Sequence, residues 1–177
     1  MRVILHICCG VCAAGAADVL LSEGHQVTGY FYNPNIYPEA EYERRLAAAQ
    51  ATARHLDFEL IDGPYDPAAW MAVAETLKDE PEGGRRCTAC YRFRLEKSYQ
   101  LMLEKGYEAI TSTLTISPHK SAKIINEIGR EIGGESFMAR DFKKKEGFKR
   151  AMELAKSWEL YRQNYCGCRY SLEGGHK

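Results

Sequence analysis

Short apolar runs that alternate with helical patterns constrain this sequence most strongly. The first run, Val3–Cys8, is almost continuously apolar and contains β-branched residues, as expected for a strand buried on both faces. Comparable runs predict strands at Gln26–Tyr32, Phe58–Ile61, Glu108–Thr113 and, in a short form, near Ser136–Met138. Strands of this kind separated by helices predict an α/β fold, with a mostly parallel sheet and helices on both of its faces.

The helical segments lie between these strands and carry recognisable end signals. Asp66-Pro67 is typical of a helix start, and Gly24 stands where a helix is expected to end. The expected helices are Ala13–Ser22, Pro38–His55, 66–77, 88–104, one that starts at Ser117-Pro118, and Lys145–Ser157. The tail from Glu159 onward is expected to be loop-like.

All seven cysteines fall into three short groups, and none stands alone. The groups are Cys8-Cys9-x-x-Cys12, Cys87-x-x-Cys90 and Cys166-x-Cys168. A Cys-x-x-Cys turn directs two thiolates at one cation, and sites in parallel sheets form at the carboxyl ends of strands. We therefore expect one α/β domain over residues 1–177, with a cysteine-rich metal site at the strand ends and a metal-binding tail at 158–177.

The cysteine spacing alone leaves three kinds of site open: a structural zinc site, an iron–sulfur cluster and a dithiol redox site. Seven thiols exceed the ligands of one tetrahedral ion, so a second site or free thiols are expected. Successive side chains on a strand point in opposite directions. A vicinal pair such as Cys8-Cys9 is therefore uncommon as a zinc clip, and service to two adjacent metal centres is the alternative.

Charge is distributed unevenly along a chain whose formal net charge is zero. Residues 140–177 contain 10 Lys and Arg against 5 Asp and Glu, whereas residues 1–139 contain 14 against 19. A basic C-terminal segment is typical of a surface that binds a polyanion, although an ordinary solvated surface has the same composition. No apolar run approaches the ~20 residues of a membrane span, and no secretory signal is recognisable, so we expect a cytoplasmic protein without a membrane partner.

Six segments together resemble the epoxyqueuosine reductases of the QueH family. They are LHICCGVC at 5–12, YFYNPNIYPEAEYERR at 30–45, DEPEGGRRCTACYRFRL at 79–95, TSTLTISPHKSAKIINEIG at 111–129, DFKKKEGFKR at 141–150 and LYRQNYCGCRYS at 160–171. These segments cover nearly the whole chain in order. One departure is Gly10-Val11, where the family commonly has Ala-Pro, but the cysteine spacing is the same.

The resemblance implies a fold related to the adenine-nucleotide α-hydrolase-like, ATP-pyrophosphatase (HUP-like) proteins. It implies an oxidoreductase that removes the epoxide oxygen from epoxyqueuosine at the tRNA wobble position, which gives queuosine. It also implies a 4Fe-4S cluster with an additional iron, tRNA as the partner and an external electron donor. Two alternatives are a zinc-stabilised RNA- or protein-binding module without catalysis, and a metal-free thiol–disulfide oxidoreductase.

All seven cysteines are the expected metal ligands under this resemblance. A cluster donates one electron at a time, and an iron with open positions can bind the epoxide oxygen as a Lewis acid. Our sequence-based hypothesis assigns to the cluster Cys9, Cys87, Cys90 and Cys168. It assigns to the second iron Cys8, Cys12 and Cys166.

Other side chains are expected to complete the site. The candidate proton donors are Asp141, Tyr165 and His119, for which lysine pairing, core packing and surface exposure are the respective alternatives. The candidates for contact with unstacked bases or phosphates are Asn33, Asn35, Tyr37, Arg94, Lys143, Lys144, Lys145 and Arg162. Arg94 lies four residues beyond Cys90 on the same helical face, so it is also a candidate to stabilise anionic thiolates.

Overall fold

A four-stranded parallel sheet forms the centre of the computed structural model, which describes residues 1–173. The strands, in the spatial order β3-β2-β1-β4, are β1 (Arg2–His6), β2 (Gln26–Phe31), β3 (Glu59–Asp62) and β4 (Ala109–Ser112). At its carboxyl end, β1 places His6 opposite Tyr30 of β2 and Ser112 of β4. The predicted parallel sheet is confirmed, and the last four residues of the predicted tail, 174–177, lie outside the described residues.

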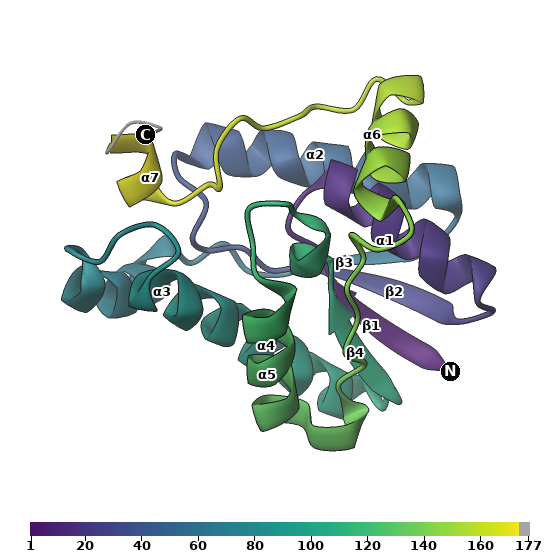
Figure 1. Cartoon of the computed structure of the whole chain (residues 1–177), viewed down its shortest axis with the longest axis horizontal. Coiled ribbons are helices and arrows are strands. Elements are labelled where there is room, and N and C mark those ends of the chain that lie inside the picture. The colour runs from purple at the N-terminus through teal and green to yellow at the C-terminus, as the bar shows by residue number, and fades with distance from the viewer. Residues whose placement is uncertain (174–177) are drawn as a thin grey trace.

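Helices cover both faces of the sheet, as predicted. They are α1 (Gly10–Ser22), α2 (Glu39–Leu56), α3 (Pro67–Ala74), α4 (Arg85–Lys105), α5 (Ala122–Gly133), α6 (Gly147–Ser157) and α7 (Arg169–Glu173). In Figure 1, α1, α2 and α6 lie on one side of the sheet and α4 and α5 on the other. Among the described helices, none is both long enough and apolar enough to span a bilayer.

The alternation of side chains along β1 explains this layered core. Leu5 packs into a fully buried cluster with residues of α1, α2 and α6, whereas its neighbour Ile4 packs into a second cluster with residues of α4 and α5. Both side chains are completely buried. Successive residues of a strand point to opposite faces, so a run that is apolar at every position must be covered on both sides.

The region after β4 differs from the sequence-based expectation. Thr113–Ile116 forms a turn of 3-10 helix, and α5 begins only at Ala122, where Ser121 caps it by accepting a hydrogen bond from the Ile124 N–H at 3.3 Å. The helix start predicted at Ser117-Pro118 is therefore wrong, because Ser121 provides the cap. Residues 117–121 remain as a loop at the carboxyl end of β4.

Two further expectations fail near the C-terminus. In place of the short strand near Ser136–Met138, the structure has a single parallel bridge between Phe137 and Ile110. The tail is not loop-like throughout, because Arg169–Glu173 forms α7. Figure 1 shows the tail running from α6 past α2 to reach α7. It thereby returns the last cysteine group toward the strand ends.

Candidate metal and substrate site

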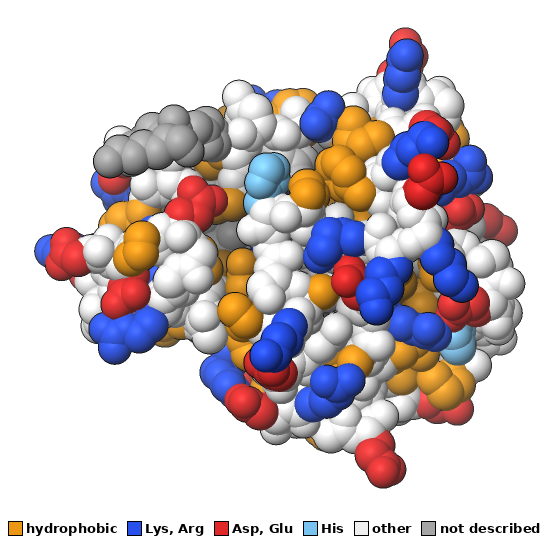
Figure 2. Space-filling view, in the orientation of Figure 1, with side chains coloured by type: hydrophobic (Ala, Val, Ile, Leu, Met, Phe, Trp, Pro, Cys, Tyr) orange, Lys and Arg blue, Asp and Glu red, His pale blue; other side chains and the backbone are white. Residues whose placement is uncertain are grey.

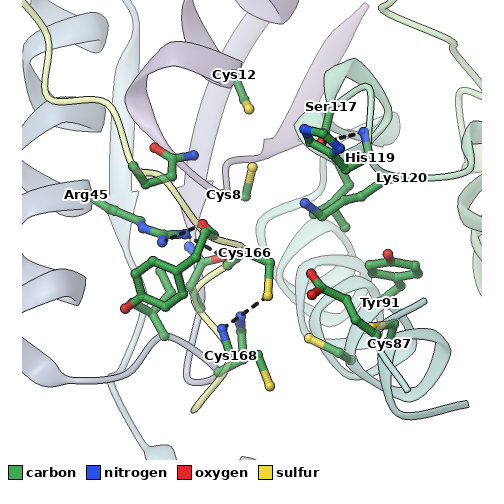
Figure 3. A pocket seen from close by; sticks show the side chains of 18 of the residues that line it. Cys8, Cys12, Arg45, Cys87, Tyr91, Ser117, His119, Lys120, Cys166 and Cys168 are labelled. Carbon is green, nitrogen blue, oxygen red and sulfur yellow. Dashed lines mark hydrogen bonds between the residues drawn. The ribbon is translucent and has the colours of Figure 1, made fainter. Parts of the chain in front are cut away.

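A cavity of about 680 Å³ lies at the carboxyl ends of the central strands. Its walls come from the loop between β1 and α1, the loop after β2, the first turns of α4, the loop after β4 and the C-terminal tail (Figure 3). Six thiols line it, from Cys8, Cys12, Cys87, Cys90, Cys166 and Cys168. The fold therefore brings all three cysteine groups to one place, since the seventh thiol, Cys9, lies beside Cys8 and Cys12.

The first group forms a compact triad. The Sγ atoms of Cys8, Cys9 and Cys12 all lie within 4.8 Å of one another, and those of Cys8 and Cys9 are 3.9 Å apart. The expectation that Cys8 and Cys9 point in opposite directions is wrong, because β1 ends at His6 and Cys9 is the N-cap of α1. At the cap, Cys9 Sγ accepts a hydrogen bond from the Cys12 N–H at 3.4 Å. Three thiols at this spacing form a group that could hold a metal ion.

The three thiols of the triad differ in acidity. Hydrogen bonds from Cys12 and Cys9 hold the pKa of Cys8 well below its usual range, with further contributions from Lys120 and from Thr113, against the effect of burial. A hydrogen bond from Cys12 favours the Cys9 thiolate, but donation to Cys8 and burial outweigh it and raise the pKa of Cys9 to about 12. The pKa of Cys12 is raised, chiefly because it donates to Cys8 and Cys9. Cys8 is thus the most acidic thiol of the triad, and a bound cation would favour loss of the protons from the other two.

The second group lies at the start of α4, which begins at Arg85 rather than at the predicted residue 88. Cys87 Sγ accepts a hydrogen bond from the Gly83 N–H at 3.1 Å, while burial raises the pKa of this thiol. Burial also raises the pKa of Cys90 to about 12, with Arg94 opposing and Cys168 and Cys166 adding to the shift. The thiols of α4 and of the tail therefore influence one another electrostatically, and both groups line the same cavity.

The third group is held in place by a buried ion pair on α2. Arg45 donates hydrogen bonds to the Tyr165 and Cys166 carbonyl oxygens, both at 3.0 Å, and its Nε lies 2.7 Å from Glu41 Oε1. The side chains of Arg45 and Glu41 are 3% and 2% exposed. Between the two cysteines, Gly167 has φ +104°, and a Cβ there would lie 2.8 Å from Arg45 Nη1. The tail therefore has a glycine where Arg45 approaches its backbone.

Arg94 places a buried positive charge beside the thiols. It is 4% exposed, and it donates to the Cys90 carbonyl at 3.2 Å and to Asn33 Oδ1 at 3.3 Å. Asn33 in turn donates to the Ile7 carbonyl at 2.8 Å, which ties the loop after β2 to β1. Within the described part of the chain Arg94 forms no ion pair with a carboxylate. Burial opposes its charge, but the thiols of Cys90 and Cys8 outweigh this and raise the pKa of Arg94.

The three predicted proton donors occupy different environments. Asp141 does not line the cavity; its carboxylate accepts a hydrogen bond from the Lys143 N–H at 3.2 Å and lies 3.4 Å from Lys143 Nζ. Tyr165 lines the cavity, but its hydroxyl donates to the Tyr37 carbonyl, and burial raises the pKa of Tyr165 to about 12. His119 lines the cavity from an exposed position in the loop after β4.

The predicted tRNA contacts are also divided. Asn33, Asn35, Arg94 and Arg162 line the cavity, and Asn35 is buried there. The remaining predicted contacts lie outside the lining: Tyr37, Lys143, Lys144 and Lys145. Lys143 is engaged with the protein, because its Nζ donates to the Thr115 carbonyl at 2.8 Å. Figure 2 shows Lys and Arg side chains gathered around α6 and the segment leading to it, with Asp and Glu side chains between them.

Several lining residues were not among the predicted site residues. Arg45, Arg86 and Tyr91 line the cavity, as do Lys120 and Gln163. One available signal for Arg45 was Glu41, which lies four residues earlier, because this spacing pairs opposite charges on a helix. Arg86 is 4% exposed and stacks at 4.7 Å on the ring of Tyr170. For Lys120 the only available signal was its position next to His119.

Comparison with known proteins identifies the family of this chain. A family model described as "Epoxyqueuosine reductase QueH" matches residues 3–174. The epoxyqueuosine reductase QueH of Thermotoga maritima is 35% identical over 178 residues, which cover 96% of this chain and 90% of that protein. The one of Streptococcus pyogenes serotype M1 is 34% identical over 180 residues, which cover 97% of this chain and 70% of that protein.

Solved structures share the fold at low sequence identity. A predicted subunit of tRNA methyltransferase from Methanocaldococcus jannaschii matches with a TM-score of 0.56 at 17% identity, over 88% of this chain and 76% of that one. An NMN synthetase from Francisella tularensis matches with a TM-score of 0.53 at 15% identity, over 93% and 66%. These matches agree with the predicted fold class, and the family match over residues 3–174 decides membership. The chain belongs to the epoxyqueuosine reductase QueH family.

Proposed function

We propose that this chain removes the epoxide oxygen from epoxyqueuosine in the anticodon loop of tRNA and so forms queuosine. The observation that carries the proposal is a cavity of about 680 Å³ that six thiols line, with the seventh, Cys9, beside Cys8 and Cys12. Such a volume is in the range of pockets that enclose a small-molecule ligand, such as a nucleoside. Family membership supplies the substrate, and the cavity supplies a place where a base and a metal centre can meet.

The residues of the cavity fit an anionic metal–thiolate group. The thiols of Cys9 and Cys90 have pKa values of about 12, so they retain their protons until a metal ion replaces them. Arg94 is buried among the thiols and forms no carboxylate ion pair in the part of the chain that the structure describes. A buried cation of this kind is stabilised when thiolates beside it carry negative charge.

The geometry favours a different division of the ligands from the sequence-based hypothesis. Tetrahedral thiolates at ~2.3 Å from one ion lie about 3.8 Å apart. Cys8 and Cys9, at 3.9 Å, and their neighbour Cys12 therefore suit a single iron. We accordingly assign to the 4Fe-4S cluster the remaining cysteines, Cys87, Cys90, Cys166 and Cys168. When bound, the cluster would supply electrons one at a time, and the single iron at the triad would offer an open position to an oxygen ligand.

The protein side chains have the tasks of admitting, holding and orienting the modified base. A base must leave the anticodon stack to reach a metal centre inside a cavity. Asn33 and Asn35 line the wall after β2, and exposed Arg162 lies on the tail side of the same cavity. We assign these three residues to the nucleoside, and the exposed Lys144 and Lys145 to the tRNA backbone outside. Both the tRNA and the external reductant are expected in the cytoplasm.

The decisive experiment is anaerobic. Purified protein reconstituted with iron and sulfide is reduced by a low-potential one-electron donor and incubated with tRNA that carries epoxyqueuosine. Mass analysis of the digested nucleosides is expected to show loss of one oxygen atom. Serine substitutions in the triad are expected to remove iron but leave acid-labile sulfide, whereas substitutions in the other four cysteines remove both.

Two outcomes would contradict the proposal. If protein that contains only zinc reduces the substrate fully, the iron-based chemistry is wrong. If the iron-loaded protein binds tRNA tightly but leaves the epoxide intact under every reductant, the chain is a binding module. A colourless preparation with stoichiometric zinc favours that second interpretation.

A further inference from the structure

Lys120 extends into the cavity from the loop after β4. Figure 3 shows it on the side opposite Arg45, with its amino group directed toward the space near Cys8. The residue is half-buried and lines the cavity together with Cys8 and Cys12. The 117–121 loop therefore directs an ammonium group into the cavity that Cys8 and Cys12 also line.

Within residues 1–173, nothing holds the Lys120 ammonium away from a ligand. Among the described residues, no ion pair or hydrogen bond involves Lys120 Nζ, whereas Lys123 on the adjacent helix lies 3.9 Å from Glu127. The Lys120 charge also favours the Cys8 thiolate, after the hydrogen bonds from Cys12 and Cys9 that chiefly lower that pKa. A half-buried cation facing thiols is thus available to a group that enters the cavity.

The backbone of Lys120 is held by the basic segment that precedes α6. Lys143 Nζ donates to the Lys120 carbonyl at 3.2 Å and to the Thr115 carbonyl at 2.8 Å. Asp141 lies 3.4 Å from the same Nζ, and the Lys120 N–H donates to the Ser117 carbonyl at 3.3 Å. Asp141 and Lys143 thereby fix the loop that carries Lys120, although neither lines the cavity.

Lys120 is better placed than the other candidates to meet an oxygen atom near the triad. The Tyr165 hydroxyl already donates a hydrogen bond to the Tyr37 carbonyl, and Asp141 pairs with Lys143 outside the cavity lining. His119 lies beside Lys120 but is exposed. A proton donor has to lie within hydrogen-bond reach of the atom that it protonates, so position is the first criterion.

We propose that Lys120 binds the epoxide oxygen of the substrate and supplies a proton to it as the carbon–oxygen bond breaks. The inference rests on the proposed function and names a further catalytic residue for it. Overall, the epoxide takes up two electrons and two protons, both carbon–oxygen bonds break, and an alkene and water form. The electrons come from the low-potential one-electron donor. Lys120 delivers one proton to the oxygen and is reprotonated from solvent through the open cavity, which also supplies the second proton.

The test compares Lys120→Met and Lys120→Arg with wild type, using iron-loaded protein and tRNA that carries epoxyqueuosine. Lys123→Met is the matched control, because Lys123 is 83% exposed on α5 and lies outside the cavity lining. Loss of a general acid typically slows chemistry by about 10²–10⁴-fold. We expect Lys120→Met to slow single turnover at least ~100-fold, with iron, sulfide and control turnover unchanged. Lys120→Arg keeps the charge but is a much weaker acid, so it is also expected to be slow.

A second readout does not depend on turnover. Without reductant, the wild type is expected to bind epoxyqueuosine tRNA about tenfold more tightly than queuosine tRNA, since a hydrogen bond to a charged group discriminates by roughly that factor. Lys120→Met is expected to bind the two tRNAs equally. Lys143→Met alone is expected to lower the single-turnover rate. Added to Lys120→Met, it should cause no further loss of rate, because its effect passes through Lys120.

Several results would overturn the inference. If the single-turnover rate of Lys120→Met is within threefold of the wild-type rate, Lys120 is not the donor. The same conclusion follows if Lys120→Met binds both tRNAs more weakly by the same factor while the bound substrate still reacts at the wild-type rate. If Lys120→Met loses iron and Lys120→Arg restores both iron and full turnover, the residue has only an electrostatic role at the metal. If wild type itself leaves the epoxide intact, the proposed function fails, and this inference fails with it.

Discussion

Arg45 on α2 donates a hydrogen bond at 3.0 Å to the carbonyl oxygen of Cys166, a residue 121 positions later in the chain. The same guanidinium binds the Tyr165 carbonyl and pairs with Glu41, so one buried side chain connects a central helix to the C-terminal ligands. Tyr37 adds a second connection by donating its N–H to the Gly167 carbonyl at 2.8 Å. The tail is thus positioned by helix α2 and the loop before it.

Removing the Arg45 guanidinium should therefore release the tail. We expect Arg45→Met to lower the free energy of unfolding by about 3 kcal/mol, because it removes the buried partner of Glu41 Oε1 and the donor to the Tyr165 and Cys166 carbonyls. The variant should also lose metal bound through Cys166 and Cys168. Denaturant titration and iron analysis measure the two effects. Arg44→Met, at a 53% exposed position, is the control and should change either quantity little.

The charge of Glu41 predicts a pH dependence. Burial opposes ionisation, but hydrogen bonds from Tyr161, Arg45 and Arg44 outweigh it and hold the pKa of Glu41 below its ordinary value of 4.5. A lowered pKa adds stability that is fully present above pH 4.5 and is lost as the pH falls through the folded-state pKa. Urea unfolding from pH 7 to pH 3 should therefore show a smaller acid-side loss in Glu41→Gln than in wild type. Parallel curves would contradict this role for Glu41.

Arg94 should tune the metal centre rather than the fold alone. Replacing Arg94 with Met removes a buried positive charge beside Cys90 and Cys8. Loss of this charge stabilises the more oxidised form of the centre, which carries more positive charge. We expect a spectroscopic redox titration of Arg94→Met to give a reduction potential lower by tens of millivolts. Arg92→Met is the matched control on α4, since Arg92 is half-exposed and pairs with Glu131. Equal shifts in both variants would rule out a specific effect of Arg94.

The three consecutive lysines before α6 should separate into two functions. Lys144 and Lys145 are exposed, so Lys144→Ala/Lys145→Ala should weaken tRNA binding and reduce the slope of log K against log salt by up to about two. Lys143 Nζ is bound to the Thr115 and Lys120 carbonyls, so Lys143→Ala should leave that slope unchanged. Binding isotherms at several salt concentrations decide between the two. If only Lys143→Ala reduces the slope of log K against log salt, Lys143 contacts the tRNA and Lys144 and Lys145 do not.

Local patterns predicted most of the secondary structure because they depend on neighbouring residues. The uninterrupted burial of Val3–Ile7 required cover on both faces of β1, and the Asp66 side chain caps α3 as expected, accepting from the Ala69 N–H at 3.1 Å. The errors arose where distant contacts decide. In the described chain, Phe137 makes one bridge to β4, and the five-residue α7 follows Cys168 in a tail that Arg45 of α2 holds.

The amino-acid sequence by itself determined the parallel α/β fold, the family and the seven-cysteine composition of the site, because periodicity, spacing and motif order are local properties. Only the tertiary structure decided which groups meet. It placed Cys9 with Cys8 and Cys12, left Asp141 and Lys143 paired outside the cavity lining and brought Lys120 into that lining. These outcomes depend on where β1 ends, on how α2 holds the tail and on which carbonyls Lys143 can reach. Each is a contact between residues far apart in the sequence, and such contacts form only when the chain folds.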